Sequence, residues 1–448
     1  NEGPAPSPSS APGGSTSSQQ ATPEPSSAPE VEYPDSFTYW LPADPNVLAV
    51  MSNIGEATVY KELERITGTK VTFQHPTGSS ADQQQQFNLL LASGNLPDVM
   101  EFNWLNNSPQ GPEKAIEDGY ILRLNDLIDE HAPNFKKFLE ENPDIEKTIK
   151  TDNGSIYGFP FIRGDEKLTV NYGAIMRKDW LDKMNLEPPT TIGEWETVLT
   201  AFKEGDPNGN GNADEIPFLL NFGHVKDANY NNLIGAWGIA AGFYQVNNQV
   251  KFGMLQPEFK QFIETMHRWY ANGLIDPDFA ITNRELQDAR MTNHELGTVH
   301  SWAGSGLGAY LNLMKDDPEF QLIGVQPPSL NKGELAPLGQ VGNRFVPTYI
   351  AAVTTKAKDP EKIVRWLDFA YGPEGHMLFN FGVEGLTYEM KDGYPAYTDL
   401  ILNNPDGLPV SQAMASHFRA SWGGPFVQDI RYYEQYASSK EQQEAIAN

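Results

Sequence analysis

The chain has 448 residues, 39% of them hydrophobic, a length that suits two domains or two interleaved lobes and allows large cores. Lys and Arg total 32 against 59 Asp and Glu, and the net charge of -27 disfavours a nucleic-acid or anionic-membrane partner through long-range repulsion. The chain has no cysteine, which excludes disulfides and thiolate sites, and no apolar run of the ~18 residues that a membrane span requires.

Residues 1–35 are rich in Pro, Ser, Ala, Gly, Thr and Glu and have almost no apolar content. We expect a disordered, extended tether that holds the rest of the chain away from a surface. The alternative is a flexible terminus without a role. The chain does not begin with a basic and then apolar leader, so we expect it to start inside a mature or trimmed protein.

The pattern changes at Phe37, where regular elements begin. "SFTYWL" predicts a strand, and "GEATVYKELERITG" predicts a helix that stops at Gly68. "KVTFQ" predicts a second strand, "SADQQQQFNLLLASG" a helix that ends at Gly94, and "LPDVMEF" a third strand. The alternation of strands and helices predicts a parallel sheet with crossover helices.

The rest of the sequence predicts a second α/β region. Residues 115–143 are expected to be largely helical, and "GSIYGFPFIRG" predicts a turn and an apolar strand. Thr191, with Glu194 three residues later, predicts a helix start. Further on, 294–314 predicts a strand, a glycine-rich turn and a helix, and the segment after Asp359 predicts a long amphipathic helix with a stop at Pro373.

Oxygen-bearing side chains recur at alternate positions of the loop "DPNGNGNADE". Counted from the first Asp, positions 1, 3, 5, 7 and 9 are Asp206, Asn208, Asn210, Asn212 and Asp214. This is the spacing of an EF-hand loop, which surrounds Ca²⁺ with about six to eight oxygens, and Gly211 at position 6 permits the sharp turn.

The loop departs from the EF-hand pattern at position 12, where Pro217 stands in place of a bidentate Glu. Glu215 can take that role. The alternative is a plain surface turn, because Asp-Pro-Asn-Gly and Asn-Gly form turns on their own. We favour a structural Ca²⁺, since a cation saturated with protein oxygens has no open position for catalysis.

Enzyme motifs are scarce in the sequence. We find no H-E-x-x-H, no G-x-S-x-G and no G-x-x-x-x-G-K-[ST], the usual signals of zinc hydrolases, α/β-hydrolases and P-loop proteins. "GSGLGA" at 304–309 resembles a dinucleotide fingerprint, but a helix N-terminus that faces a cleft is the better interpretation. A pair of carboxylates for glycosidase chemistry stays open, because 59 acids offer many pairs.

Several segments together resemble the extracellular solute-binding proteins of carbohydrate ABC importers. They are "LLLASGNLPDVMEF", "AIEDGYILRLNDLIDEHAPN", "GSIYGFPF", "IMRKDWLDKMNLEPPTTIGEWETVLTAFKEGDPNGNGNADEIP" and "DPEKIVRWLDFAYGPEGHMLFNFGVEGLTYE". The resemblance covers about Phe37 to Glu389. It is greatest to the calcium-loop branch, with its alginate-binding members and its lipoprotein-type members of Gram-positive bacteria.

The resemblance implies an α/β, two-lobe periplasmic-binding-protein-like fold of type II, hinged by three interlobe crossings. We expect the crossings near Arg163, near Thr348 and between Glu384 and Tyr394. The N-lobe is then 36–163 plus 348–388, and the C-lobe is 164–347 plus 389–448. Relatives usually continue further at the C-terminus, so we expect a C-lobe that is trimmed or completed differently.

The resemblance also implies binding roles and a location. Ca²⁺ is expected at Asp206, Asn208, Asn210, Asn212, Asp214 and Glu215. The tether is expected to be the stalk of a cell-surface lipoprotein whose anchoring cysteine precedes the first residue.

Sugars present apolar C–H faces and hydroxyls, so their sites combine aromatic rings with a few hydrogen-bonding groups. In related maltose-type binders, tryptophans at the positions that resemble Trp302 and Trp422 touch sugar. The candidate ligand-binding residues at strand ends and crossings are Trp104, Arg163, Tyr172, Trp302, Arg344 and Trp422. The alternative for each ring is core packing, and for each arginine a salt bridge at the lobe surface.

The predicted function is capture of an oligosaccharide between two lobes by a monomer, followed by delivery to the membrane permease of an ABC importer. Closure around the sugar would shift an open-to-closed equilibrium. The prediction is of a binding protein and not an enzyme, with no nucleic-acid partner. A secreted glycoside-active enzyme and a surface polysaccharide-adhesion protein stay as alternatives.

Overall fold

The computed structural model describes residues 3, 31–220, 233–339, 342–437 and 439–447. The chain divides into a unit of residues Asn1–Glu32 and a unit of residues Tyr33–Asn448. The predicted tether at 1–35 lies almost entirely outside the described residues. None of the helices in the described ranges has the length and apolar content needed to cross a membrane.

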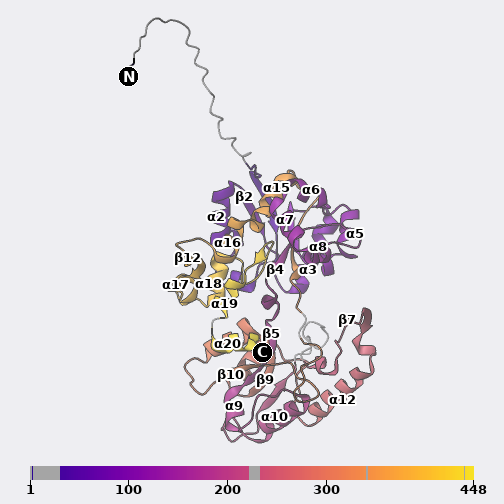
Figure 1. Cartoon of the computed structure of the whole chain (residues 1–448), viewed down its shortest axis with the longest axis vertical. Coiled ribbons are helices and arrows are strands. Elements are labelled where there is room, and N and C mark those ends of the chain that lie inside the picture. The colour runs from indigo at the N-terminus through magenta and orange to yellow at the C-terminus, as the bar shows by residue number, and fades with distance from the viewer. Residues whose placement is uncertain (1–2, 4–30, 221–232, 340–341, 438, 448) are drawn as a thin grey trace. The chain divides into compact units, whose positions relative to one another are not determined.

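The larger unit contains a six-stranded sheet with strand order β14-β4-β11-β3-β1-β2, of which β2 and β4 are labelled in Figure 1. Its strands are β1 (Ser36–Trp40), β2 (Lys70–Gln74), β3 (Val99–Phe102), β4 (Phe159–Arg163), β11 (Phe345–Val353) and β14 (Val427–Gln428). Strand β1 pairs in parallel with β2 and β3, as the alternating pattern predicts. Strand β11 enters antiparallel between β3 and β4, so the sheet is mixed.

The helices between the first three strands form where their end signals predict. Helix α2 (Thr58–Thr67) ends at Gly68 with φ 71°, and α3 (Ser80–Ser93) ends at Gly94 with φ 68°. Both glycines adopt the left-handed conformation that a side chain disfavours. Ser79 and Asp82 form a capping box at the start of α3.

The remaining elements around the first sheet come from two distant parts of the chain. The first part supplies α1 (Pro45–Leu48), α4 (Trp104–Asn107), α5 (Gly111–Glu117), α6 (Asn125–His131), α7 (Pro133–Glu141) and α8 (Pro143–Ile149). The second supplies α15 (Pro360–Asp368), α16 (Pro373–Phe381), β12 (Tyr388–Lys391), β13 (Tyr394–Tyr397), α17 (Asp399–Leu402), α18 (Val410–His417) and α19 (Ile430–Tyr436). Their apolar side chains join one hydrophobic core with the sheet, which we call the first core. Helix α15 ends before Pro373, as predicted, and Pro373 begins the next helix, α16.

A four-stranded sheet with order β10-β5-β9-β6 lies in the middle of the chain. Its strands are β5 (Tyr172–Arg177), β6 (Ile216–Leu219), β9 (Leu296–Trp302) and β10 (Leu322–Val325). Ala174 and Met176 belong to one hydrophobic cluster, whereas Ile175 between them belongs to another. Side chains alternate between faces along a strand, so this sheet is buried on both faces.

Helices cover both faces of the second sheet. They are α9 (Lys178–Lys183), α10 (Ile192–Glu204), α12 (Pro257–Ala271), α13 (Arg284–Thr292), α14 (Ala309–Leu313) and the C-terminal α20 (Lys440–Ala447). A separate hairpin is made of β7 (Phe243–Val246) and β8 (Gln249–Phe252). Thr191 caps α10 as predicted, and its hydroxyl oxygen accepts from the Glu194 N–H at 3.1 Å. The Glu194 carboxylate accepts from the N–H of Thr190 and not from that of the cap residue Thr191.

The segment 389–448 is expected in the second lobe, and the structure places most of it elsewhere. Tyr397, Phe418 and Tyr432 are buried in the first core, and β14 joins the first sheet beside β4. The hairpin β12–β13 packs there too, with Tyr388 and Tyr397 against Phe381 at 5.9 and 5.7 Å, so it is no crossing. The chain reaches the second sheet again only between α19 and α20, and α20 lies beside β10 (Figure 1).

Asp368 is a buried carboxylate that joins α15 to the start of α7. It accepts from the N–H groups of Phe135 at 2.7 Å and Asn134 at 3.2 Å, and from the Asn134 amide at 2.8 Å. Burial raises the pKa of Asp368 to about 6 despite these bonds. The folded chain thus holds the Asp368 proton more tightly than the unfolded chain does.

We predict that replacing Asp368 with Asn removes a pH-dependent part of the stability. The contribution of Asp368 is fully present below about pH 4 and is lost as the pH rises through about 6, a change of about 3 kcal/mol. Urea unfolding at pH 4 to 7 should therefore show Asp368→Asn gaining stability relative to wild type as the pH rises. The exposed Asp152→Asn should run parallel to wild type, and parallel curves for Asp368→Asn would contradict the assignment.

Candidate ligand-binding and metal sites

The loop from Asp206 to Glu215 curls around the carboxylate of Asp206. The backbone N–H groups of Asn210 and Gly211 donate to the two Asp206 oxygens, each at 3.1 Å. Gly209 and Gly211 have φ angles of 72° and 76°, so glycine is needed where the backbone turns. The predicted sharp turn is therefore present, and its carboxylate is held in one orientation.

The amide side chains of the loop converge on Asp214. Asn208 donates to Asp214 at 3.0 Å, and Asn210 donates to both Asp214 oxygens at 3.1 and 2.9 Å. The Asn212 N–H donates to the side-chain oxygen of Asn210 at 2.7 Å. The side chains of Asn208 and Asn210 thus meet at Asp214, while Asn212 contributes its backbone N–H.

Glu215 is the buried member of the loop. Its side-chain oxygen Oε1 is buried without a hydrogen-bond partner in the described part of the chain, and its residue is 9% exposed. Burial, together with the carboxylates of Asp214 and Asp206, raises the pKa of Glu215. A buried, unpartnered carboxyl oxygen beside two further carboxylates lacks a positive charge, and a bound cation would supply one.

The donor set suits a hard cation. Among the described residues, no three His, Cys, Asp or Glu side chains gather as metal ligands, so carboxylates alone do not form a site. Asn and main-chain oxygens would have to complete it, which is the ligand chemistry of Ca²⁺ and not of Zn²⁺. The residues of the loop therefore fit a calcium ion.

The loop is anchored to the second sheet on both sides. It follows α10 and leads into β6, where the Ile216 N–H donates to the Glu295 carbonyl at 2.7 Å. The Asn208 amide also donates to the His294 carbonyl at 3.2 Å. An ion in the loop would thus stiffen the start of β9.

Tyr172 and Trp302 are the two candidate ligand residues that the structure brings together in the second sheet. They are direct partners across β5 and β9, and their rings lie 5.1 Å apart at 69°. Trp302 is half-buried, while Tyr172 is buried and its ring stacks over His300 at 6.3 Å. Both residues stand at the sheet end where the chain arrives from β4.

Trp104 lies in the interior of the first core. Its indole is fully buried, donates to the Met100 carbonyl at 3.0 Å and meets the ring of Phe87 edge-on at 5.0 Å. The core alternative is therefore the one that the structure supports for Trp104.

Trp422 also belongs to the first core and not to the second sheet. The side chain is 6% exposed, and its ring lies edge-on to Tyr349 at 6.4 Å. The guanidinium of Arg419 stands over the ring at 4.0 Å. Its indole Nε1 is buried and has no hydrogen-bond partner among the described residues.

Arg163 and Arg344 lie together where the chain passes between the sheets, but not as two free cations. The Arg163 N–H donates to the Arg344 carbonyl at 2.8 Å, and Arg344 Nε donates back to the Arg163 carbonyl at 3.0 Å. Arg344 also donates to the carbonyl of Gly164 at 3.3 Å and to Asn142 at 3.4 Å. Arg344 is thus bound to the backbone of the first crossing.

The glycines of "GSGLGA" allow another segment to approach closely. A Cβ on Gly304 would lie 2.5 Å from the ring of Tyr436, and one on Gly308 would lie 2.3 Å from the Gln442 amide. Gln442 of α20 donates to the Ala303 carbonyl at 2.9 Å. The end of the chain covers this turn, so close packing accounts for its glycines better than a nucleotide does.

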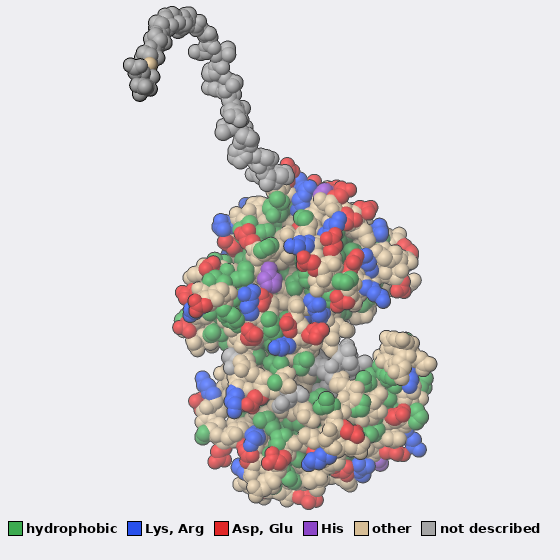
Figure 2. All heavy atoms as spheres, viewed as in Figure 1, with side chains coloured by type: hydrophobic (Ala, Val, Ile, Leu, Met, Phe, Trp, Pro, Cys, Tyr) green, Lys and Arg blue, Asp and Glu red, His purple; other side chains and the backbone are tan. Residues whose placement is uncertain are grey.

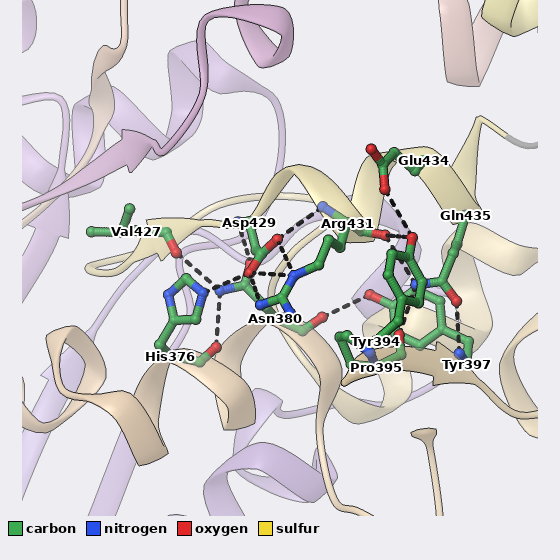
Figure 3. A network of polar contacts seen from close by, with 10 residues as sticks. All are labelled: His376, Asn380, Tyr394, Pro395, Tyr397, Val427, Asp429, Arg431, Glu434 and Gln435. Carbon is green, nitrogen blue, oxygen red and sulfur yellow. Dashed lines mark hydrogen bonds and ion pairs between the residues drawn. The ribbon is translucent and has the colours of Figure 1, made fainter. Parts of the chain in front are cut away.

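Two polar groups escape sequence reasoning. One is the buried ion pair of Glu101 and Arg419, for which an acid inside the apolar strand "DVMEF" is the available signal. The other joins α16 to α19, where Asp429 bonds His376 at 2.8 Å and Arg431 at 2.5 Å (Figure 3). Burial raises the pKa of the Asp429 carboxyl, but the hydrogen bonds from His376 and Arg431 outweigh it and hold the pKa well below its usual range. No sequence spacing brings Glu101 to Arg419 or His376 to Asp429.

Comparison with known proteins places the chain among binding proteins. The sequence model of bacterial extracellular solute-binding proteins matches residues 52–377. The fructooligosaccharide ABC transporter substrate-binding protein FusA of Streptococcus pneumoniae is 27% identical over 88% of this chain and 70% of FusA. Lipoprotein LipO of Bacillus subtilis is 26% identical over 79% of this chain and 68% of LipO.

Solved structures agree with this placement. The alginate-binding protein AlgQ2, crystallised without calcium ion, is 30% identical with a TM-score of 0.72 over 92% of this chain and 81% of AlgQ2. FusA in complex with kestose has a TM-score of 0.71 at 24% identity, over 92% of this chain and 82% of FusA. An EF-hand mutant of FusA with fructo-nystose has a TM-score of 0.70 over 92% and 83%. The likenesses confirm the predicted α/β, two-lobe fold class and the resemblance stated from the sequence.

We predict that Arg344→Ala loosens the passage between the sheets. The variant loses the side-chain donors to the carbonyls of Arg163 and Gly164, which should reduce stability by about 1–3 kcal/mol. Hydrogen–deuterium exchange should accelerate around residues 163–165, and the exposed Arg123→Ala should leave it unchanged. Loss of ligand binding with unchanged exchange would instead mark Arg344 as a ligand group.

Proposed function

Because the chain belongs to the family of bacterial extracellular solute-binding proteins, we propose that it captures an oligosaccharide outside the cell and delivers it to the permease of an ABC importer. The observation that carries the proposal is the family match over residues 52–377, joined to two sheets with separate cores. FusA is a fructooligosaccharide ABC transporter substrate-binding protein and AlgQ2 binds alginate, and both support a saccharide ligand for this chain.

The ligand is proposed to lie between two lobes whose bounds follow the cores. The first lobe would be 33–168 with 345–437, and the second 169–344 with 439–447. The chain passes between them after Leu168, before Phe345 and after Tyr436. A sugar that contacts both lobes stabilises the closed state by its differential contacts there, and that state then docks on the permease.

Tyr172 and Trp302 are the best-supported aromatic contacts for the sugar. Their rings lie side by side at one end of the second sheet, and Trp302 retains exposed surface. An edge-on pair offers one ring face for stacking and holds it rigid. Trp422 is proposed as the first-lobe counterpart, whereas Trp104 is left as a core residue.

We propose binding without turnover, since the family and its relative FusA are binding proteins. New reducing ends after incubation with oligosaccharides would favour a glycoside-active enzyme. Binding of polymer without lobe closure, seen by small-angle scattering, would favour an adhesion protein. The excess of 59 acids over 32 bases opposes a nucleic-acid partner, and a monomer suffices for two-lobe capture.

The local charges, and not the total, decide which saccharide enters. On the face shown in Figure 2, acidic and basic side chains are interspersed, so no single-sign region dominates that face. The family is extracellular, and the likeness to lipoprotein LipO supports a lipid anchor at the cell surface of a Gram-positive bacterium. The Pro- and Ser-rich residues 1–35 would then be its stalk.

We further propose that Asp206, Asn208, Asn210, Asn212, Asp214 and Glu215 hold a structural Ca²⁺. The convergence of the side chains on Asp214 and the unpartnered Glu215 oxygen support it. AlgQ2 without calcium and the FusA EF-hand mutant indicate that relatives have such a site. When bound, the ion would neutralise the loop carboxylates, and it has no open position for chemistry.

We predict that oligosaccharides stabilise the protein against heat. A thermal-shift screen with fructo-oligosaccharides and uronate oligosaccharides should yield a ligand that raises Tm. At a ligand concentration of a hundredfold Kd, binding should add about 2.7 kcal/mol to the free energy of unfolding. Trp302→Ala should weaken the binding of that ligand at least tenfold, because it loses a stacking face. Trp269→Phe, at a fully buried core indole, serves as control. No ligand across the panel, or equal binding by Trp302→Ala, would count against the site.

We predict that chelation lowers Tm in wild type and that added Ca²⁺ restores it. The double variant Asp206→Asn with Glu215→Gln should lose most of this response, because two charged ligands become neutral. Asp406→Asn is the matched control, since Asp406 stands in a similar Asn-Pro-Asp-Gly turn that offers no such donor series. A Tm indifferent to chelator and Ca²⁺ in wild type would refute the metal site.

A further inference from the structure

Glu101 and Arg419 form an ion pair in the interior of the first core. Arg419 donates from its two terminal nitrogens to the two Glu101 oxygens, at 3.0 and 2.6 Å. Both side chains are 1% exposed. Two charges rarely lie so deep, because the loss of water costs several kcal/mol for each of them.

Two tyrosines complete the bonding of the pair. The Tyr39 hydroxyl donates to Glu101 at 2.7 Å, and Arg419 donates to the Tyr60 oxygen at 2.9 Å. Tyr39 lies on β1, Tyr60 on α2 and Glu101 on β3, so three elements contribute to holding the pair. Each nitrogen of the Arg419 guanidinium and each Glu101 carboxylate oxygen thus has a hydrogen-bond partner.

On the other side, the loop 419–426 wraps around the same guanidinium. Arg419 Nε donates to the Gly423 carbonyl at 2.7 Å. The backbone N–H groups of Trp422 and Gly423 donate to the Arg419 carbonyl at 3.2 and 3.0 Å. A Cβ on Gly424 would lie 2.4 Å from Arg419 Cζ. Gly423 and Gly424 have φ angles of 94° and 152°, which other residues avoid.

The ring of Trp422 is stacked on this guanidinium. Arg419 Cζ lies 4.0 Å from the ring centroid, within the range of a strong cation–π contact. The indole N–H has no acceptor among the described residues, so no hydrogen bond there orients the ring. Its orientation is set by Arg419 on one face and by the edge-on Tyr349.

A buried ion pair is a poor source of stability, because apolar residues of similar volume often do as well. Its distinct property is geometric: a planar fork bonds in one orientation only. Here one fork joins β3, the loop carbonyl of Gly423 and the face of Trp422. We propose that Glu101 and Arg419 are positioning residues that hold Trp422 in the orientation in which it contacts the oligosaccharide. This inference rests on the proposed function.

The first test observes the ring without a ligand. In protein labelled with 5-fluorotryptophan, the Trp422 and Trp302 resonances are assigned from Trp422→Phe and Trp302→Phe. Arg419→Lys keeps the charge but loses the fork and the flat stacking face, so the Trp422 resonance should shift and broaden while that of Trp302 stays. Arg431→Lys, in the partly exposed network around Asp429, is the control and should leave the Trp422 resonance unchanged (Figure 3).

The second test measures binding by calorimetry with the saccharide that raises Tm most in the screen, and with kestose if none does. Arg419→Lys should bind at least tenfold more weakly, and Tyr60→Phe, which removes one bond from the guanidinium, should lie between it and wild type. If Arg419→Lys does not fold, Tyr60→Phe and Glu101→Gln replace it in both tests. The Trp422 resonance should then shift in each of these variants, in the same direction but by different amounts.

An unchanged Trp422 resonance in these variants would overturn the proposal. So would equal affinity of Arg419→Lys and wild type in a protein where Trp422→Ala loses binding. If wild type binds no saccharide, the proposed function fails, and with it the claim of a sugar contact, while the fluorine spectra still decide whether Arg419 sets the ring. A shifted resonance with a tenfold loss of affinity, and a Tm no lower than that of Arg431→Lys, supports the positioning role.

Discussion

The hydrogen-bonded joint between the first and second passages of the chain is the constraint on which the rest of this structure depends. Arg163 and Arg344 bond each other through the backbone, and the Arg344 side chain adds donors to the carbonyls of Arg163 and Gly164. The Gly164 N–H in turn donates to the Gln428 carbonyl oxygen. A Cβ on residue 164 would lie only 2.4 Å from that oxygen, so the close approach requires glycine. Strands β4, β11 and β14 are thereby held together just where the chain leaves the first sheet. The two cores are joined here, and again where the segment after Tyr436 packs against the turn at Ala303 through Gln442.

The joint also explains which candidate residues can serve a ligand. Arg344 already donates to the carbonyls of Arg163 and Gly164, so its guanidinium would have to break these bonds to reach a ligand. An aromatic ring can stack on a sugar through an open face without breaking a hydrogen bond. We therefore propose Tyr172 and Trp302 for the sugar in preference to Arg344.

Local signals in the sequence were sufficient for the individual elements. Gly68 and Gly94 end their helices because each adopts the left-handed conformation and its N–H donates to a carbonyl of the last turn. The spacing of polar residues in 206–214 likewise predicts the curled turn that the structure shows. The lobe to which 389–437 belongs was not predictable in this way. The lobe assignment is decided by long-range contacts such as Phe381 with Tyr397 and Glu101 with Arg419. The local sequence around each of these residues is compatible with either lobe. Likewise, an indole such as Trp104 carries the same local pattern whether it faces a core or a ligand.

Strand β9 links the two features of the second sheet that matter most for the proposed function. Its first residues adjoin the loop, through the Glu295 carbonyl bonded to Ile216 and the His294 carbonyl bonded to Asn208. Its last residue is Trp302, and the strand between is buried on both faces and paired on both edges. A strand held in this way does not bend, so fixing its start also fixes the ring at its end. An ion in the loop would therefore support the proposed sugar binding without touching the sugar, because it would hold in place the strand that carries Trp302.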